Sequence, residues 1–166
     1  HLYLSPVLTA APGSEHGYDV TDPSSVSAEL GGPEGLSGLA EAARSRGMGL
    51  VVDIVPNHVA VDAPQHNSWW WEVLKHGPAA VRARSFDIDW RADPDGRILL
   101  PVLGCDDDLD NMELDGDQLR LGPLSFPVAP GTAGDGADPR TVHSRQHYRL
   151  VSWRAGVCGY RRFFAV

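Results

Sequence analysis

The stretch "LVVDIVPNHV", residues 50–59, determines how the rest of the chain is interpreted. Five of its first six residues are apolar, a pattern that predicts a buried strand. Asp53 nevertheless stands in the middle of this run, and Pro56, Asn57 and His58 follow it directly. An ionised carboxylate in a buried strand is costly unless it is paired or hydrogen-bonded. Since the strand contains no cation, we expect a partner from elsewhere in the fold; the alternative is a structural aspartate bonded to neighbouring backbone.

The residues before this stretch complete a βαβ unit. The segment "LYLSPV", residues 2–7, is a short apolar strand, and a polar loop follows at residues 8–24. Residues 31–47 carry apolar side chains at i, i+3, i+4 and i+7, which is the pattern of one helix face. Pro33 suits the first turn of this helix and Gly47 suits its end. We therefore expect two parallel strands joined by a right-handed helical crossover.

Two polar segments follow the ends of these strands. The first, "EHGYDVTD", contains His16, Tyr18 and Asp19, and the second contains Asn57 and His58. Because the carboxyl ends of parallel strands meet at one edge, we expect both segments on the same face. An aromatic ring flanked by carboxylates and imidazoles suits a sugar, since the ring packs on the pyranose and the polar groups bond its hydroxyls.

A metal site is the competing interpretation of the same cluster. Imidazole and carboxylate groups are possible metal ligands, and four are present: His16, Asp19, Asp53 and His58. Their order along the chain contains no HxxH or HExxH spacing. We therefore expect neither a metal nor another cofactor.

Composition excludes several classes of partner. A net charge of −8 argues against nucleic acid, which requires a clustered basic surface. No apolar run approaches the roughly 20 residues that span a bilayer, so we expect no membrane segment. The two cysteines, Cys105 and Cys158, match no metal spacing and fit a reducing cytoplasm. The chain opens on "HLYLSPVL" and closes on "YRRFFAV", and we expect both ends to be cuts in a longer sequence.

The character of the sequence changes after residue 62, where it becomes mixed and loop-rich. A short helix is predicted over residues 66–77, and an Asp-Gly turn predicts a hairpin of residues 112–114 with 118–121. Residues 140–154 read as a helix or as a passage from helix to strand.

Four features of this second half leave alternatives open. Three adjacent tryptophans, Trp69 to Trp71, point about 100° apart on a helix, so one or two of them must pack in the core while one can meet a ligand. The acidic run at residues 106–111 lacks the glycine and terminal Glu of a calcium loop, which favours a solvated turn. His143 and His147 fall at i, i+4 and would bind a metal only if helical. The segment "YRRFF", residues 160–164, is either a strand edge or a sugar contact.

The pairing of "HGYDVTD" with "GMGLVVDIVPNH" across a βαβ unit resembles the α-amylase superfamily, glycoside hydrolase family 13. The resemblance implies an α/β fold, a partial TIM (β/α)8 barrel of the α-amylase type. Residues 1–62 would supply barrel strands 2 and 3 with their catalytic-face loops, and residues 63–166 would form a large mixed α+β insertion after the third strand.

The resemblance also implies roles for individual residues. Tyr18 would stack on the sugar at the reaction site, and His58 would hydrogen-bond it. Asp53 would support the site from inside the barrel beside an arginine of the fourth strand, and Asn57 would order the loop. Two further residues are expected near the same subsite: His16 and Asp19. In this family the nucleophile, the general acid and a third acidic residue follow strands four, five and seven, so no catalytic carboxylate is expected in this chain.

Longer segments narrow the resemblance to the maltooligosyl trehalose synthases of that family. These segments are "DIVPNHVAVDAPQHNSWWWEVLKHGP", "FDIDW", "LPVLG", "RQHYRLVSW" and "YRRFF". The resemblance implies a glucosylmutase that converts the reducing-end α-1,4 linkage of a maltooligosaccharide, or of a glycogen-derived α-1,4-glucan, into an α,α-1,1 linkage. Functional coupling to a trehalose-releasing hydrolase is a further expectation. We expect the insertion to help exclude water, which favours isomerisation over hydrolysis.

Two alternatives to the mutase remain at this point. The barrel motifs alone also fit an amylase-type hydrolase or a 4-α-glucanotransferase. A non-catalytic product of a truncated gene, with residual sugar binding, is the other alternative. By itself the chain of 166 residues is expected to be inactive.

Overall fold

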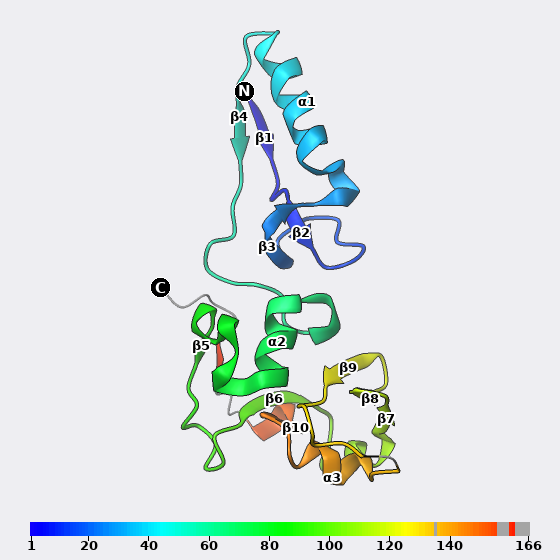
Figure 1. The fold of residues 1–166 in the computed structure, drawn as a ribbon. Coiled ribbons are helices and arrows are strands. Elements are labelled where there is room, and N and C mark those ends of the chain that lie inside the picture. Colours follow the sequence, from blue (N-terminus) through cyan, green and yellow to red (C-terminus); the bar gives the residue numbers. More distant parts are fainter. Residues whose placement is uncertain (135, 156–159, 162–166) are drawn as a thin grey trace. The chain divides into compact units, whose positions relative to one another are not determined.

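The computed structural model describes residues 1–134, 136–155 and 160–161. The chain divides into two compact units, His1–Val61 (unit 1) and Asp62–Val166 (unit 2), and each is described by itself (Figure 1). In the described part of the chain, no helix combines the length and the apolar character needed to cross a membrane.

Unit 1 is built on the predicted βαβ unit. Strand β1 (Leu2–Leu4) pairs in parallel with β4 (Leu50–Val52), and helix α1 (Gly32–Arg44) lies alongside them (Figure 1). The parallel arrangement and the helix are therefore confirmed. Both strands are shorter than predicted: β1 ends before Pro6, which has no N–H for a ladder. One further bond, from the Asp53 N–H to the Leu4 carbonyl at 2.9 Å, continues the register beyond β4.

The segment predicted as an open loop at residues 8–24 contains a hairpin instead. Strand β2 (Leu8–Ala10) pairs antiparallel with β3 (Val20–Val26), with irregular register on both sides of Thr9. The Thr9 hydroxyl lies 2.8 Å from that of Ser25, and polar side chains of this kind hide the apolar alternation by which strands are recognised. A 3-10 helix, η1 (Ala28–Leu30), leads from the hairpin into α1.

The prediction that residues 50–55 form a buried strand is wrong for this chain. Val51 is 46% exposed, Val52 is 37% exposed and Ile54 is 66% exposed. Two strands and one helix do not provide enough neighbours to bury a strand on both faces. The apolar run therefore marks a strand that the described part of unit 1 leaves largely in solvent.

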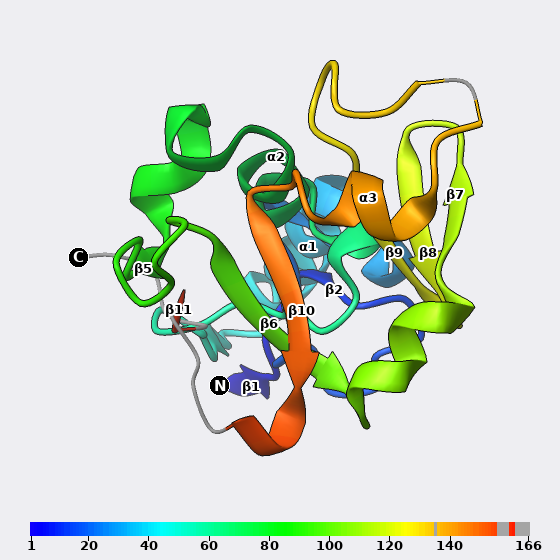
Figure 2. The same cartoon turned by 90° about the horizontal axis from the view of Figure 1, so that it is seen from below.

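In its described residues, unit 2 has three small sheets. Strands β6 (Ile98–Leu103) and β10 (Tyr148–Ser152) pair in parallel and lie side by side in Figure 2. The other strands pair antiparallel, and their bounds are β5 (Asp87–Ile88), β7 (Glu113–Asp115), β8 (Gln118–Leu121), β9 (Leu124–Pro127) and β11 (Tyr160–Arg161). Within these, β7, β8 and β9 form one sheet, and β5 pairs with β11. The predicted hairpin at the Asp-Gly turn is thus confirmed as β7–β8.

The helices of unit 2 are short. They are η2 (Pro64–His66), α2 (Ser68–His76), η3 (Gly77–Ala79), η4 (Val81–Ser85), η5 (Asp106–Asn111), α3 (Pro139–His143) and η6 (Trp153–Ala155). Helix α2 begins where Asn67 accepts the Trp70 N–H at 3.0 Å, an ordinary side-chain N-cap. The helix predicted over 66–77 is confirmed, and α3 followed by β10 is the predicted passage from helix to strand.

Trp70 and Tyr148 anchor the core of unit 2. Both side chains are fully buried, and Trp70 packs against Phe86 with ring centroids 5.0 Å apart. Tyr148 packs on Phe126 at 5.6 Å and donates its hydroxyl to the Pro127 carbonyl at 3.0 Å. One of the three adjacent tryptophans is thus a packing residue, as predicted, while Trp69 and Trp71 are half-buried.

The remaining expectations for unit 2 have mixed outcomes. The acidic run is the helix η5, in which Asp108 accepts the Gly104 N–H at 2.7 Å, so it is an ordered turn held by its own carboxylate. His143 and His147 do not share a helix, because α3 ends at His143, so the condition for a metal pair is not met. Cys158 and residues 162–164 lie outside the described residues.

Candidate functional site

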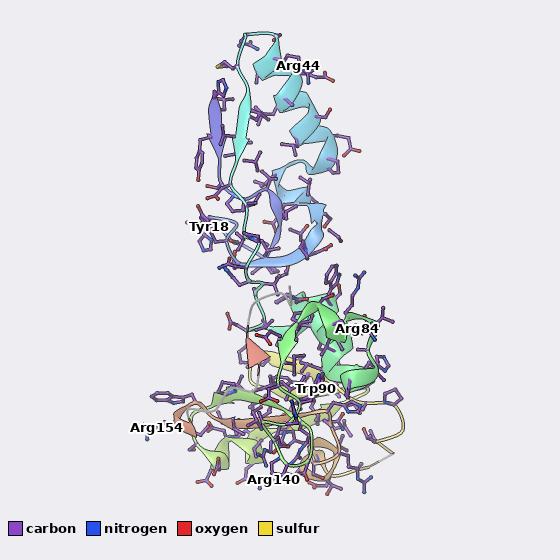
Figure 3. The ribbon with its side chains drawn as sticks, turned by 90° about the vertical axis from the view of Figure 1, so that its left-hand side faces the viewer. Tyr18, Arg44, Arg84, Trp90, Arg140 and Arg154 are labelled. Carbon is purple, nitrogen blue, oxygen red and sulfur yellow. The ribbon has the colours of Figure 1, made fainter. Side chains whose placement is uncertain are left out.

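The site lies at the carboxyl ends of β1 and β4, where unit 1 gathers the two polar segments noted in the sequence. Figure 3 shows Tyr18 at one end of unit 1 and Arg44, the last residue of α1, at the other. Tyr18 reaches this end from the turn between β2 and β3, and His58 reaches it from the segment after β4. Parallel pairing of β1 with β4 brings both segments to the same edge.

Asp53 is the centre of the cluster and has three donors. The hydroxyls of Tyr18 and Tyr3 donate to its Oδ2 at 2.6 and 2.8 Å, and the Ile54 N–H donates to Oδ1 at 2.9 Å. These bonds, that from Tyr18 foremost, hold the pKa of the Asp53 carboxyl below its usual value. The partner that we expect from elsewhere in the fold is thus a pair of tyrosine hydroxyls, and Asp53 is half-buried rather than fully buried.

Tyr18 is held at three of its polar atoms. Its hydroxyl binds Asp53, its carbonyl lies 3.1 Å from His58 Nε2, and its N–H donates to His16 Nδ1 at 3.1 Å. The bond to the Asp53 carboxylate raises the pKa of Tyr18 to about 12, so the phenol stays protonated near neutral pH. The side chain is nevertheless 42% exposed, which leaves ring surface free for a ligand.

His58 and Asn57 form the other side of the cluster. His58 Nε2 lies 3.1 Å from the Tyr18 carbonyl oxygen, which can only accept a hydrogen bond. The second ring nitrogen of His58 lies 3.1 Å from Asn57 Oδ1. Asn57 Oδ1 is also an acceptor, so a neutral imidazole donates to one of these two oxygens at a time.

His16 and Asp19 lie beside Tyr18 rather than beside Asp53. His16 Nδ1 is 3.6 Å from the Asp19 carboxylate, and the His16 and Tyr18 rings lie 5.9 Å apart. The Ser14 hydroxyl also donates to Asp19. Asp22, within β3, accepts from the Ser24 N–H at 2.8 Å and from the hydroxyls of Ser24 and Ser25.

Tyr3 is a member of the cluster that sequence reasoning missed. It sits in β1 opposite Val51 of β4, and Asp53 follows Val51 on the same face two residues later. The signal was available: once the strands are taken as parallel, register places an aromatic side chain of β1 beside the carboxylate. The contact between Tyr3 and Asp53 is not evident from the sequence alone, because "LYLSPV" shows only the pattern of an apolar strand.

A cavity of about 390 Å³ adjoins this cluster within unit 1. Its apolar wall includes Leu36 and Leu39 of α1, and its polar rim includes Tyr3, Ser14 and His16. The cluster therefore borders a concave, mixed surface, as ligand sites commonly do.

The groups of the cluster are suited to binding rather than to proton transfer. A carboxylate whose pKa is held low by three hydrogen bonds is ionised at neutral pH, so Asp53 is an anchor and not a proton donor. In the residues that the structure describes, no group of three or more His, Cys, Asp and Glu is arranged to hold a metal ion. Exposed ring, imidazole and amide together match the face and the hydroxyls of a sugar.

The comparisons with known proteins agree with this geometry. The family described as "Alpha amylase, catalytic domain" matches residues 1–97. A Mycobacterium tuberculosis protein named as a maltooligosyl trehalose synthase is 64% identical over the whole chain, which covers 21% of that protein. The solved structure of maltooligosyltrehalose synthase from Arthrobacter ramosus superimposes with a TM-score of 0.91 at 55% identity, covering 99% of this chain and 22% of that one. An intracellular maltogenic amylase of Bacillus subtilis is 36% identical over 76 residues, 46% of this chain and 12% of that protein.

These matches settle the fold type and the family. The resemblance to maltooligosyl trehalose synthases extends over the full 166 residues. The chain nevertheless spans only about a fifth of the length of those relatives, 21% for the Mycobacterium tuberculosis protein. The family match and the structural match together give an α/β fold of the TIM-barrel type. The chain belongs to the α-amylase family.

Proposed function

We propose that the chain is one part of a glucosylmutase that turns the reducing-end α-1,4 linkage of a maltooligosaccharide into an α,α-1,1 linkage. The likeness to maltooligosyl trehalose synthases over the whole chain supports this assignment. The substrate would be a maltooligosaccharide or a glycogen-derived α-1,4-glucan. The reaction would be an intramolecular transglucosylation, in which the released glucose is held and attacks again through its anomeric hydroxyl.

The observation that carries the proposal is the tethered Tyr18 ring. Its hydroxyl, carbonyl and N–H are all bonded within the cluster, while 42% of the side chain remains exposed. A ring fixed in this way loses little side-chain entropy when a sugar packs against it. Tyr18 is therefore the stacking platform in this proposal, and His58 is the group that bonds a hydroxyl of the same sugar.

The other residues of the cluster have supporting roles. Asp53 holds Tyr18 through its hydroxyl, and Asn57, which lies against the His58 ring, orders the loop. His16 and Asp19 border the same subsite from the hairpin. The nucleophile and the general acid, which retaining glycosidases place about 5 Å apart, are assigned to other parts of the enzyme.

We also propose a place for each unit in the complete barrel. Strands β1 and β4 would be its second and third strands, and unit 2 would be the insertion after the third strand. In the described part of the chain β1 and β4 pair only with each other, so each has one free edge. The exposed face of β4 and the apolar wall of the cavity beside β1 provide surfaces that further barrel elements would cover.

Cellular context follows from the same proposal. A product with an α,α-1,1 end is a substrate for a trehalose-releasing hydrolase, with which the enzyme would be functionally coupled. Of the two cysteines, Cys105 lies in the described residues and is free and exposed. Free thiols suit a reducing compartment, and we assign the enzyme to the cytoplasm.

Product analysis tests the proposal. The complete polypeptide that contains these 166 residues would be incubated with maltopentaose, and the products followed by anomeric NMR and by reducing-end assay. The expected result is loss of reducing ends with a new α,α-1,1 signal. Glucose and shorter maltooligosaccharides with intact reducing ends would support the amylase-type hydrolase favoured by the Bacillus subtilis relative. Redistributed α-1,4 chain lengths would indicate a glucanotransferase, and no turnover would indicate a non-catalytic product.

A further inference from the structure

We propose that Tyr3 is a positioning residue, which fixes the Tyr18 ring by clamping Asp53 from the neighbouring strand. The inference rests on the proposed function, since it assumes that Tyr18 contacts the glucan. It adds a residue of β1 to a site otherwise formed by the hairpin and by the segment after β4.

The geometry of the carboxylate supports this role. Two phenol hydroxyls converge on one oxygen: Tyr18 at 2.6 Å and Tyr3 at 2.8 Å from Asp53 Oδ2. The other oxygen, Oδ1, is occupied by the Ile54 N–H at 2.9 Å. With donors on both oxygens, rotation of the carboxylate breaks at least one hydrogen bond. The Tyr3 hydroxyl therefore restrains the Asp53 carboxylate, which in turn holds Tyr18.

The backbone places Tyr3 for this contact. Tyr3 pairs with Val51 across the parallel ladder, and Asp53, one residue beyond the end of β4, is the next residue on the same face. The bond from the Asp53 N–H to the Leu4 carbonyl extends this register to Asp53 itself. The distance between the two side chains is thus set by the sheet and not by a flexible loop.

Within unit 1 the Tyr3 side chain is exposed and is held by its hydrogen bond to Asp53. Its side chain is 68% exposed in this chain, so it contributes little to the core of unit 1. Asp53 raises the pKa of Tyr3, and the Tyr3 hydroxyl helps to hold the pKa of Asp53 down, second to that of Tyr18. Both shifts have the direction expected for a phenol that donates to an ionised carboxylate.

A double-mutant cycle in the complete polypeptide tests the inference. Tyr3→Phe removes only the hydroxyl and is expected to lower kcat/KM for maltopentaose by about three- to tenfold, the effect of one lost hydrogen bond. In an Asp53→Asn background the same substitution should change kcat/KM by less than about 1.5-fold, since the contact it removes acts through the carboxylate. Tyr148→Phe, which removes a tyrosine hydroxyl from the core of unit 2, is the matched control and should leave kcat/KM unchanged.

The pH dependence of the activity distinguishes a positioning role from a purely structural one, because a purely structural role would leave it unchanged. Without Tyr3 the Asp53 carboxylate loses a donor and binds its proton at higher pH, so the loss of activity in Tyr3→Phe should grow as the pH is lowered toward about 4. An active wild type with full activity in Tyr3→Phe, or an equal effect of Tyr3→Phe in both backgrounds, would overturn the positioning role alone. A wild type that binds and converts no glucan would overturn the proposed function and this inference with it.

Discussion

Asp53 connects three segments of unit 1, so its charge is the most informative one to remove. Asp53→Asn in the complete polypeptide replaces a carboxylate that accepts from two phenols by a neutral amide. Hydrogen bonds to charged groups are stronger than neutral ones, and we expect kcat/KM for maltopentaose to fall by about ten- to a hundredfold. Asp115→Asn, at an exposed carboxylate paired with Arg120 in unit 2, is the matched control. Equal activity of the two variants would contradict the anchoring role of Asp53.

The burial of His143 leads to a prediction about how the free energy of unfolding depends on pH. Burial lowers the pKa of His143 to about 4, with neighbouring arginines adding to the effect, and its Nε2 accepts the Leu150 N–H at 3.1 Å. The unfolded chain binds a proton near pH 6.5 and the folded chain does not, so stability is full above that pH and falls as the pH is lowered toward 4. The loss is about 3 kcal/mol, measurable as faster hydrogen exchange of the Leu150 amide after correction for the intrinsic rate.

The substitution His143→Gln provides the control for this titration. Glutamine keeps an acceptor for the Leu150 N–H but does not titrate, so the pH dependence between 4 and 6.5 should flatten. The same slope in both proteins would show that another group causes it.

Single residues also show what the sequence could predict of the site. Tyr18, Asp53 and His58 were grouped correctly because parallel strands place their carboxyl ends together. Their partners were not predictable in the same way. The sequence predicts a partner for Asp53 from elsewhere in the fold but does not identify it. The structure supplies two phenols, and a phenol in an apolar strand looks like a packing residue until the register is known.

The β2–β3 hairpin carries Tyr18, and its turn depends on Gly17. Gly17 has φ of +76°, and a Cβ on it would lie 2.5 Å from the Pro6 carbonyl oxygen. Gly13 in the same segment has φ of +75°, but a Cβ on it would meet no other atom within 4 Å. Both alanine variants incur the cost of left-handed backbone, but only Gly17→Ala also forces the hairpin to move.

We expect Gly17→Ala to lower kcat/KM in the complete polypeptide by more than about tenfold, and Gly13→Ala to change it by less than about twofold. Steady-state kinetics with maltopentaose, together with a melting temperature for each variant, separates loss of the site from loss of the fold. Similar kinetics in the two variants would mean that the position of the hairpin does not control the site.

Helices and strands differed in how far the sequence predicted them. Helix α1 and the β7–β8 hairpin were recognisable from helical periodicity and from an Asp-Gly turn, both of which are local signals. The β2–β3 hairpin was missed because its strands are polar and their pairing is irregular. The burial expected for β4 failed because burial depends on neighbouring strands, and in the described residues β4 pairs with β1 alone.

The length of the whole chain leads to one prediction about its activity. The chain spans about a fifth of the length of its relatives, 21% for the Mycobacterium tuberculosis protein. The carboxylate at the centre of the cluster, Asp53, is an ionised anchor. We therefore expect the purified 166-residue chain to convert no maltopentaose to an α,α-1,1 product. An equimolar comparison with the complete polypeptide by anomeric NMR checks this, and product from the chain alone would contradict it.

The most direct test of the sugar site is a crystal structure of the complete polypeptide with a bound, slowly converted maltooligosaccharide analogue. The account predicts a glucose ring packed on the exposed face of Tyr18, within about 4 Å of the phenol ring, with one of its hydroxyls bonded to His58. A glucan bound with Tyr18 and His58 free of sugar contact would contradict it.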